Sequence, residues 1–248
     1  MDAKTTVRRA FENGLVVPAF NVPYPPMLKP IAQAIADEDS VAMIQVARLE
    51  WEKFQSVMVD ASRLDLQGNI AATKAVADIA HAAGIPVEAE LGAVMGHETS
   101  QATIPYDEIF EKKLGFTEVA DARQFVEGSG CDWLSVAVGS VHGAIADNLK
   151  DQKKPAARLD IDRIAELRAA LDIPLVLHGG SGIENEYITR GIRAGIAKIN
   201  VGTELRQPYE RAMRERNDTE YAREQVYIRC RELIRDFLHT AGDAKILG

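Results

Sequence analysis

Short apolar runs rich in β-branched residues alternate with longer amphipathic runs along the 248-residue chain, and this alternation limits the fold more than any other feature. Each short run is apolar almost throughout, which is typical of parallel strands buried on both faces. A strand followed by a helix, many times over, predicts an α/β fold with a parallel sheet. Seven such runs occur, at residues 15–22, 41–47, 56–62, 85–92, 133–139, 174–180 and 196–202.

Helical patterns fill the intervals between these runs. Residues 69–84 place small and apolar side chains on one face, and either Asp160 or Asp162 can cap a later helix. Beyond residue 204 the charges alternate in sign, which indicates terminal helices with a solvated face. We expect residues 1–248 to form one domain, since a barrel of this length is commonly a single domain.

Polar residues gather where the predicted strands end. They are Asn21, Asp60, Glu88, Glu90, His142, His178 and Asn200. In a TIM (β/α) barrel the carboxyl ends of the strands build the active site. We therefore predict such a barrel, incomplete because seven strands are recognisable. A doubly wound sheet is the alternative, but no strand leads into the glycine fingerprint of dinucleotide-binding proteins.

Charge and composition exclude several classes of function. The chain has 29 Lys and Arg against 37 Asp and Glu, a net charge of -8 that argues against binding to duplex nucleic acid. Its two cysteines, Cys131 and Cys230, are far apart and suggest neither a disulfide framework nor a cysteine zinc site. No apolar run of about 18 residues is present to span a membrane. We expect a cytoplasmic protein that binds neither nucleic acid nor membranes.

Two glycine-containing turns predict a phosphate site. Both follow consecutive strands, and small residues let backbone N–H groups approach an anion closely. The second turn also precedes a helix, whose N-terminus favours phosphate. The turns are Gly179, Gly180 and Ser181 after His178, and Asn200, Val201, Gly202 and Thr203.

Two histidines at strand ends indicate a metal site. His142 and His178 would meet at the barrel mouth together with the carboxylates Asp60 and Glu90. Neutral imidazoles suit zinc, and a catalytic zinc keeps one position open. Residues 95–122 lack a steady apolar period and predict a long loop over the strand ends, of the kind that often acts as a lid.

Taken together, the strand motifs resemble those of the class II, zinc-dependent ketose-bisphosphate aldolases, the fructose- and tagatose-bisphosphate aldolase family. The match covers nearly the whole chain and keeps the order of the family's motifs. The matching stretches are VPAFNV, MIQV, SVMVDAS, PVEAELGAVMGHE, SVAVGSVHG, PLVLHGGSGI and KINVGTEL.

This resemblance implies reversible aldol cleavage of a ketose phosphate to dihydroxyacetone phosphate and an aldehyde. It assigns His142 and His178 as zinc ligands, Asp60 and Glu90 to a neighbouring or second cation, divalent or monovalent, and Glu98 as the mobile acid/base. Zinc would polarise the ketone, and Glu98 would remove the adjacent carbon-bound proton. The residues implied to bind the substrate are Gly143, Gly179, Gly180, Ser181, Asn200, Val201, Gly202 and Thr203. We also expect a homodimer or homotetramer.

The chain departs from the family at one place. In the family, a strand ending in Leu-Asp-His lies between the MIQV and SVMVD strands and supplies a zinc ligand and the aldehyde proton donor. Here about ten residues join these two strands, and the motif is absent. One βα unit of roughly 30 residues is missing. The chain is therefore an aldolase, a phosphosugar-binding relative with impaired catalysis, or an internally deleted enzyme.

A second departure is Arg63, which stands where a histidine is common in the family. Arg63 either contacts a substrate phosphate or carboxylate or pairs with Asp65 at the surface. Lys198, next to the second turn, is expected to have an electrostatic or structural role rather than to form a Schiff base.

Overall fold

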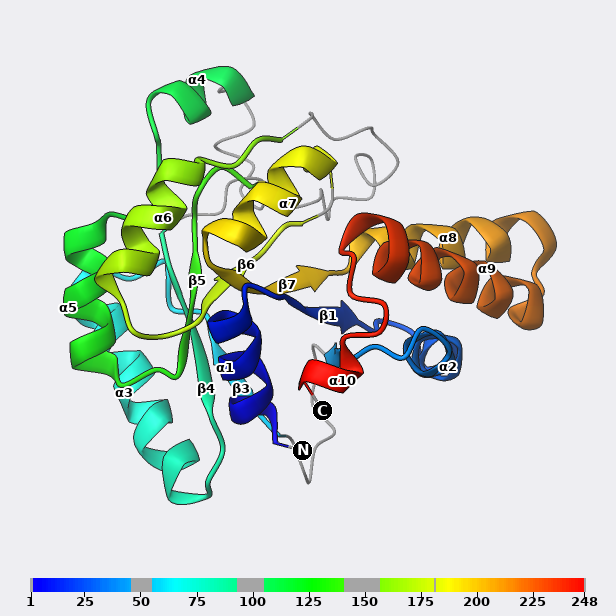
Figure 1. Ribbon diagram of the computed structural model, residues 1–248, viewed down its shortest axis with the longest axis horizontal. Coiled ribbons are helices and arrows are strands. Elements are labelled where there is room, and N and C mark those ends of the chain that lie inside the picture. The colour runs from blue at the N-terminus through cyan, green and yellow to red at the C-terminus, as the bar shows by residue number, and fades with distance from the viewer. Residues whose placement is uncertain (1, 46–54, 93–104, 141–156, 181, 248) are drawn as a thin grey trace.

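The computed structural model describes residues 2–45, 55–92, 105–140, 157–180 and 182–247. Its seven strands form one parallel sheet curled into an open half-barrel (Figure 1). Each predicted apolar run contains one strand, so the predicted α/β class and the incomplete TIM barrel are confirmed. The strands are β1 (Val17–Asn21), β2 (Met43–Gln45), β3 (Val57–Val59), β4 (Val87–Leu91), β5 (Trp133–Val136), β6 (Leu175–Leu177) and β7 (Ile196–Val201).

The half-barrel is open between β2 and β3. The strand order is β2-β1-β7-β6-β5-β4-β3, so two strands that follow each other in the sequence lie at opposite edges of the sheet. Strands of a closed barrel are buried, but all of β2 is partly exposed and Met58 in β3 is 42% exposed. The opening therefore lies where the sequence lacks a βα unit. Residues 46–54, which join the two edges, are outside the described ranges.

Helices cover the outer face of the sheet. Phe20, Leu134 and Ile199 belong to the main core between this face and the helices. The helices and helical turns are α1 (Ala3–Asn13), η1 (Pro25–Met27), α2 (Leu28–Asp37), α3 (Leu66–Ala82), α4 (Tyr106–Glu111), α5 (Val119–Ser129), α6 (Ile161–Ala170), α7 (Asn185–Ala194), α8 (Thr203–Arg216), α9 (Thr219–Glu232), η2 (Leu233–Phe237) and α10 (Ala244–Leu247). Within the described ranges, none of these is long and apolar enough to cross a membrane.

A second core closes the amino ends of the strands. Phe11 of α1 packs there with Val17, Trp133 and Val176, which lie near the starts of β1, β5 and β6. This apolar floor leaves the carboxyl ends of the strands as the polar side of the sheet.

Aspartate side chains cap the starts of two of the predicted helices. Of the two candidate caps, Asp160 is the N-cap of α6 and accepts a hydrogen bond from the backbone N–H of Arg163. Helix α3 starts earlier than its pattern suggested, because Asp65 caps it by accepting from the N–H of Gly68.

The prediction of an irregular loop over residues 95–122 is wrong for its second half. Residues 106–111 form α4, and α5 begins at Val119. Phe110 and Phe116 pack edge to face with ring centroids 5.9 Å apart. Helix α4 has only six residues, too few to give a detectable apolar period, and its aromatic contacts hold it in place. Residues 95–104 of the predicted lid lie outside the described ranges.

Candidate active site

The imidazole of His178 lies between two carboxylates of β4. Its Nε2 is 2.9 Å from Glu88 Oε1, and its Nδ1 is 2.8 Å from Glu90 Oε2. Glu88 and Glu90 are two residues apart on one strand and so project from the same face of the sheet. His178 follows β6 directly, and all three side chains are buried. The structure therefore brings together two of the residues predicted for the metal site.

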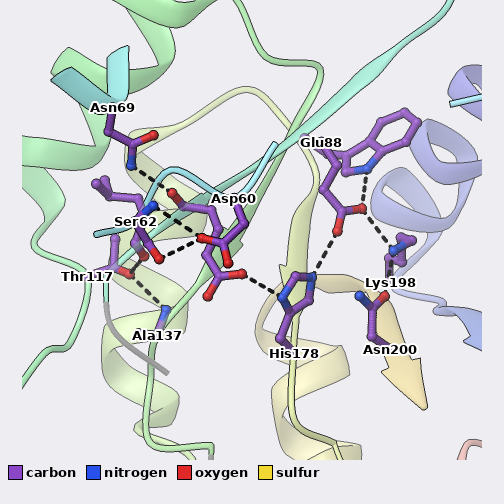
Figure 2. A network of polar contacts seen from close by, with 12 residues as sticks. Asp60, Ser62, Asn69, Glu88, Thr117, Ala137, His178, Lys198 and Asn200 are labelled. Atoms are coloured by element: carbon purple, nitrogen blue, oxygen red, sulfur yellow. Dashed lines mark hydrogen bonds and ion pairs between the residues drawn. The ribbon is translucent and has the colours of Figure 1, made fainter. Parts of the chain in front are cut away.

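Glu88 connects this histidine to a buried lysine. Its Oε2 is 2.8 Å from Lys198 Nζ and accepts a hydrogen bond of 2.6 Å from the indole Nε1 of Trp133. Lys198 also donates to Asn200 Oδ1 at 2.5 Å (Figure 2). The network joins β4, β5, β6 and β7 across the inner face of the sheet. Lys198 thus has the electrostatic role expected from the sequence.

Opposite charges outweigh burial in this network. Burial alone would raise the pKa of Glu88, but Lys198 and His178 lower it to about 2. Burial alone would lower the pKa of His178, but hydrogen bonds to Glu88 and Glu90 raise it to about 9. The two neighbouring carboxylates therefore favour the protonated imidazole, which can donate from both nitrogens.

Among the described residues, the contacts of His178 and Glu90 do not form a zinc site. A zinc-bound imidazole must offer one nitrogen lone pair, whereas both nitrogens of His178 are hydrogen-bonded to carboxylates. The contact of 2.8 Å between Nδ1 and Glu90 leaves no room for an ion between these two atoms. Across the described ranges, no three His, Cys, Asp or Glu side chains are grouped to hold a metal ion.

Asp60, the other carboxylate predicted for the metal site, follows β3 near the open edge. It is exposed and accepts hydrogen bonds from the backbone N–H and the hydroxyl of Ser62, at 3.2 and 2.7 Å (Figure 2). These contacts fix a local turn. Arg63, three residues after Asp60 in the sequence, is also exposed.

The two predicted phosphate turns follow neighbouring strands, since β6 and β7 pair with Leu177 opposite Ile199. Gly179 has a φ of +71°, and a Cβ on Gly180 would come within 2.8 Å of Ile199 Cγ2. Only glycine fits both positions without strain. The first turn thus lies close against the end of β7.

The second turn starts α8. Asn200 and Val201 end β7, Gly202 is the N-cap, and Thr203 is the first helical residue. Gly202 provides no side-chain hydrogen bond to the first-turn N–H groups. The Asn21 amide borders this turn, since a Cβ on Gly202 would lie 3.1 Å from Asn21 Nδ2.

Four predicted site residues lie outside the described ranges, namely Glu98, His142, Gly143 and Ser181. Their roles remain predictions.

Sequence analysis placed Glu88 among the polar residues at the strand ends but did not predict its contacts, and it gave Trp133 no part in the site. The spacing Glu-x-Glu in a strand was the available signal, because it places both carboxylates on the face that also carries His178. No spacing indicated that Trp133 would donate to Glu88, since the two are 45 residues apart.

The parallel half-barrel, with its ionisable residues gathered at the carboxyl ends of the strands, defines an enzyme-type α/β barrel. The chain belongs to the class II fructose-bisphosphate aldolase family, whose model matches residues 49–243. This is a zinc-dependent family of aldehyde-lyases that process phosphosugars. The match begins inside residues 46–54, the join between β2 and β3.

Solved structures of aldolases have the same fold as this chain. The YdjI aldolase from Escherichia coli K12 is 27% identical, with a TM-score of 0.77 over 98% of both chains. The fructose-bisphosphate aldolase from Campylobacter jejuni is 17% identical, with a TM-score of 0.71 over 97% of this chain and 96% of that one. At the lower identity the likeness concerns the fold alone.

Proposed function

We propose that this protein binds the dihydroxyacetone phosphate portion of a ketose phosphate at the carboxyl ends of β6 and β7. The observation that carries the proposal is the adjacency of two glycine turns, one of which is the uncapped N-terminus of the 14-residue helix α8. First-turn N–H groups that lack a side-chain partner attract anions. Glu204, the acidic residue of this turn, is paired with Arg229 Nη2 at 2.7 Å.

The reaction that family membership supports is reversible aldol cleavage of a ketose phosphate or bisphosphate. Its products are dihydroxyacetone phosphate and an aldehyde. Glu98 is the proposed acid/base that moves the proton on the carbon next to the ketone. Lys198 and Asn200, hydrogen-bonded at the end of β7, would orient the polar end of the substrate.

The open sheet favours a second candidate, a phosphosugar-binding relative whose aldol cleavage is slow or absent. The gap between β2 and β3 is the position of the family's Leu-Asp-His strand. The described donors also fit zinc poorly, because both nitrogens of His178 are engaged by carboxylates. We therefore propose that binding is retained and that cleavage is weak compared with complete relatives.

A ligand titration tests the binding proposal. Dihydroxyacetone phosphate at a hundredfold excess over its dissociation constant should raise the free energy of unfolding by about 2.7 kcal/mol. Dihydroxyacetone without phosphate, at the same concentration, should have little effect because the turns recognise the anion. An absence of any shift at millimolar dihydroxyacetone phosphate would overturn the proposal.

We also propose the oligomeric state, the cellular location and the metal cofactor of this protein. Family membership supports a homodimer or homotetramer, a cytoplasmic location and zinc as the cofactor of complete relatives. Light scattering of the purified chain would measure its mass, and a monomer would contradict the assembly.

A further inference from the structure

The hydroxyl of Tyr106 joins two backbone segments that lie far apart in the sequence. It accepts a hydrogen bond from the N–H of Arg158 at 2.6 Å, and it lies 3.1 Å from the carbonyl oxygens of Gly139 and Arg158, to either of which it can donate. Gly139 follows β5, whereas Arg158 precedes α6. One phenol therefore uses both its donor and its acceptor on backbone groups.

The ring that carries this hydroxyl is firmly placed. Tyr106 begins α4 and lies 6.1 Å from the ring of Phe110. The guanidinium of Arg158 lies over Phe110 at 4.6 Å and pairs with Asp107 at 2.6 Å. A Cβ on Gly139 would come within 2.8 Å of Phe110, so these groups are in close contact.

The segment held by Tyr106 continues to the first phosphate turn. The N–H of Ala157 donates to the carbonyl of Gly182 at 3.0 Å, and the N–H of Glu184 donates to the carbonyl of Ala157 at 3.2 Å. These bonds form an isolated parallel bridge between Ala157 and Ile183. On its other side the segment is fixed by the N–H of Asp160, which donates to the carbonyl of Val138 at 2.9 Å. Ala157 and Arg158 thus lie between the end of β5 and the end of the glycine turn.

We propose that Tyr106 is a positioning residue for the first phosphate turn, which begins with Gly179 and Gly180 and is followed by Gly182. Its hydroxyl fixes Arg158, and the neighbouring Ala157 fixes the carbonyl of Gly182, so the turn presents its N–H groups in one geometry. The proposal rests on phosphate binding at this turn, as proposed above. Tyr106, on α4, lies outside the sequence motifs that carry the resemblance to the family.

The test compares Tyr106→Phe with the wild-type chain. The substitution keeps the aromatic ring and removes only the hydroxyl, leaving the N–H of Arg158 without its partner. We expect dihydroxyacetone phosphate and inorganic phosphate to bind about tenfold more weakly by calorimetry well below the melting temperature, because a turn that is no longer held in one geometry must be ordered on binding. The matched control is Tyr227→Phe. Tyr227 lies on α9, away from the first phosphate turn, and its hydroxyl donates to Asp37 at the end of α2, at 2.6 Å.

The outcomes separate this proposal from the proposed function. A lower melting temperature with unchanged dissociation constants in Tyr106→Phe would show a merely structural role and overturn the positioning proposal. Equal weakening in Tyr106→Phe and Tyr227→Phe would overturn it too. A wild-type chain that binds neither ligand would overturn the proposed function, and the positioning role with it. Weaker binding in Tyr106→Phe alone would support both.

Discussion

Glu88 and His178 form a buried ion pair, with Oε1 2.9 Å from Nε2, and each member has a second partner of opposite charge. Lys198 contacts the other oxygen of Glu88, and Glu90 contacts the other nitrogen of His178. With all four groups ionised, two carboxylates balance two cations. This balance allows so many charges to be buried on the inner face of the sheet, on or next to β4, β6 and β7.

Glu88→Gln should destabilise the fold strongly. The substitution keeps the shape of the side chain but leaves Lys198 and His178 without their shared anion. Breaking a buried pair on one side costs about 3–5 kcal/mol, and we expect a loss in that range in urea unfolding at pH 7. The matched control is Glu186→Gln, which removes an exposed partner of Arg190 and should cost less than about 1 kcal/mol. Equal losses in both variants would contradict the role of Glu88.

Gly180→Ala should weaken phosphate binding. The new methyl group would come within 2.8 Å of Ile199 Cγ2 and push the turn away from β7. We expect affinity for dihydroxyacetone phosphate to fall by about tenfold, equivalent to about 1.4 kcal/mol. Gly128→Ala is the matched control, because its methyl group would meet Ile70 Cγ2 at the same 2.8 Å, in a helix away from the turns. Unchanged affinity in Gly180→Ala would count against the turn as a binding element.

Asp160→Asn should reduce stability in a pH-dependent way. Burial would raise the pKa of Asp160, but the hydrogen bonds from Lys113 and from the backbone N–H of Arg163 lower it below 3.8. A lowered pKa in the folded state stabilises the protein above the unfolded value and loses this effect as the pH falls. The gap in unfolding free energy between wild type and variant should therefore be largest at pH 7 and shrink below about pH 4. A gap that widens on acidification would contradict this assignment.

Glu98→Gln should reduce whatever turnover the protein shows. Loss of a general base typically lowers a rate by about 10² to 10⁴, while affinity for dihydroxyacetone phosphate should change little. Glu108→Gln, which removes an exposed partner of Lys112 on α4, is the control and should leave the rate unaltered. An unchanged rate in Glu98→Gln would assign the proton transfer to another group.

The strands and their polar ends could be predicted from the sequence because they depend on local pattern. Runs that are apolar almost throughout, such as residues 133–139, are buried on both faces, and the residues that follow each run share one edge of a parallel sheet. The missing unit was also visible, because residues 46–54 are too few for a helix and a strand. The structure adds that β2 and β3 stay apart as the two edges of the sheet.

The contacts within the site could not be predicted in the same way. Glu88 meets Lys198 across 110 residues of sequence, and Tyr106 meets Arg158 across 52. Such pairs depend on the register of neighbouring strands and on side-chain direction, which no local period encodes. His178 illustrates the difference, since its place at a strand end was predicted but its pairing with two carboxylates was not.

The most direct test of this account is the rate of fructose bisphosphate cleavage by the purified chain supplied with zinc, measured as release of dihydroxyacetone phosphate. Enzymes commonly turn over about 1–10³ times per second. We predict a rate at least about 10²-fold below the lower end of that range, because the resemblance to the family implies that a proton-donating Asp and a zinc-binding His are absent together with their strand. A chain that keeps one zinc per subunit through dialysis and cleaves the substrate at an ordinary enzymatic rate would contradict the account.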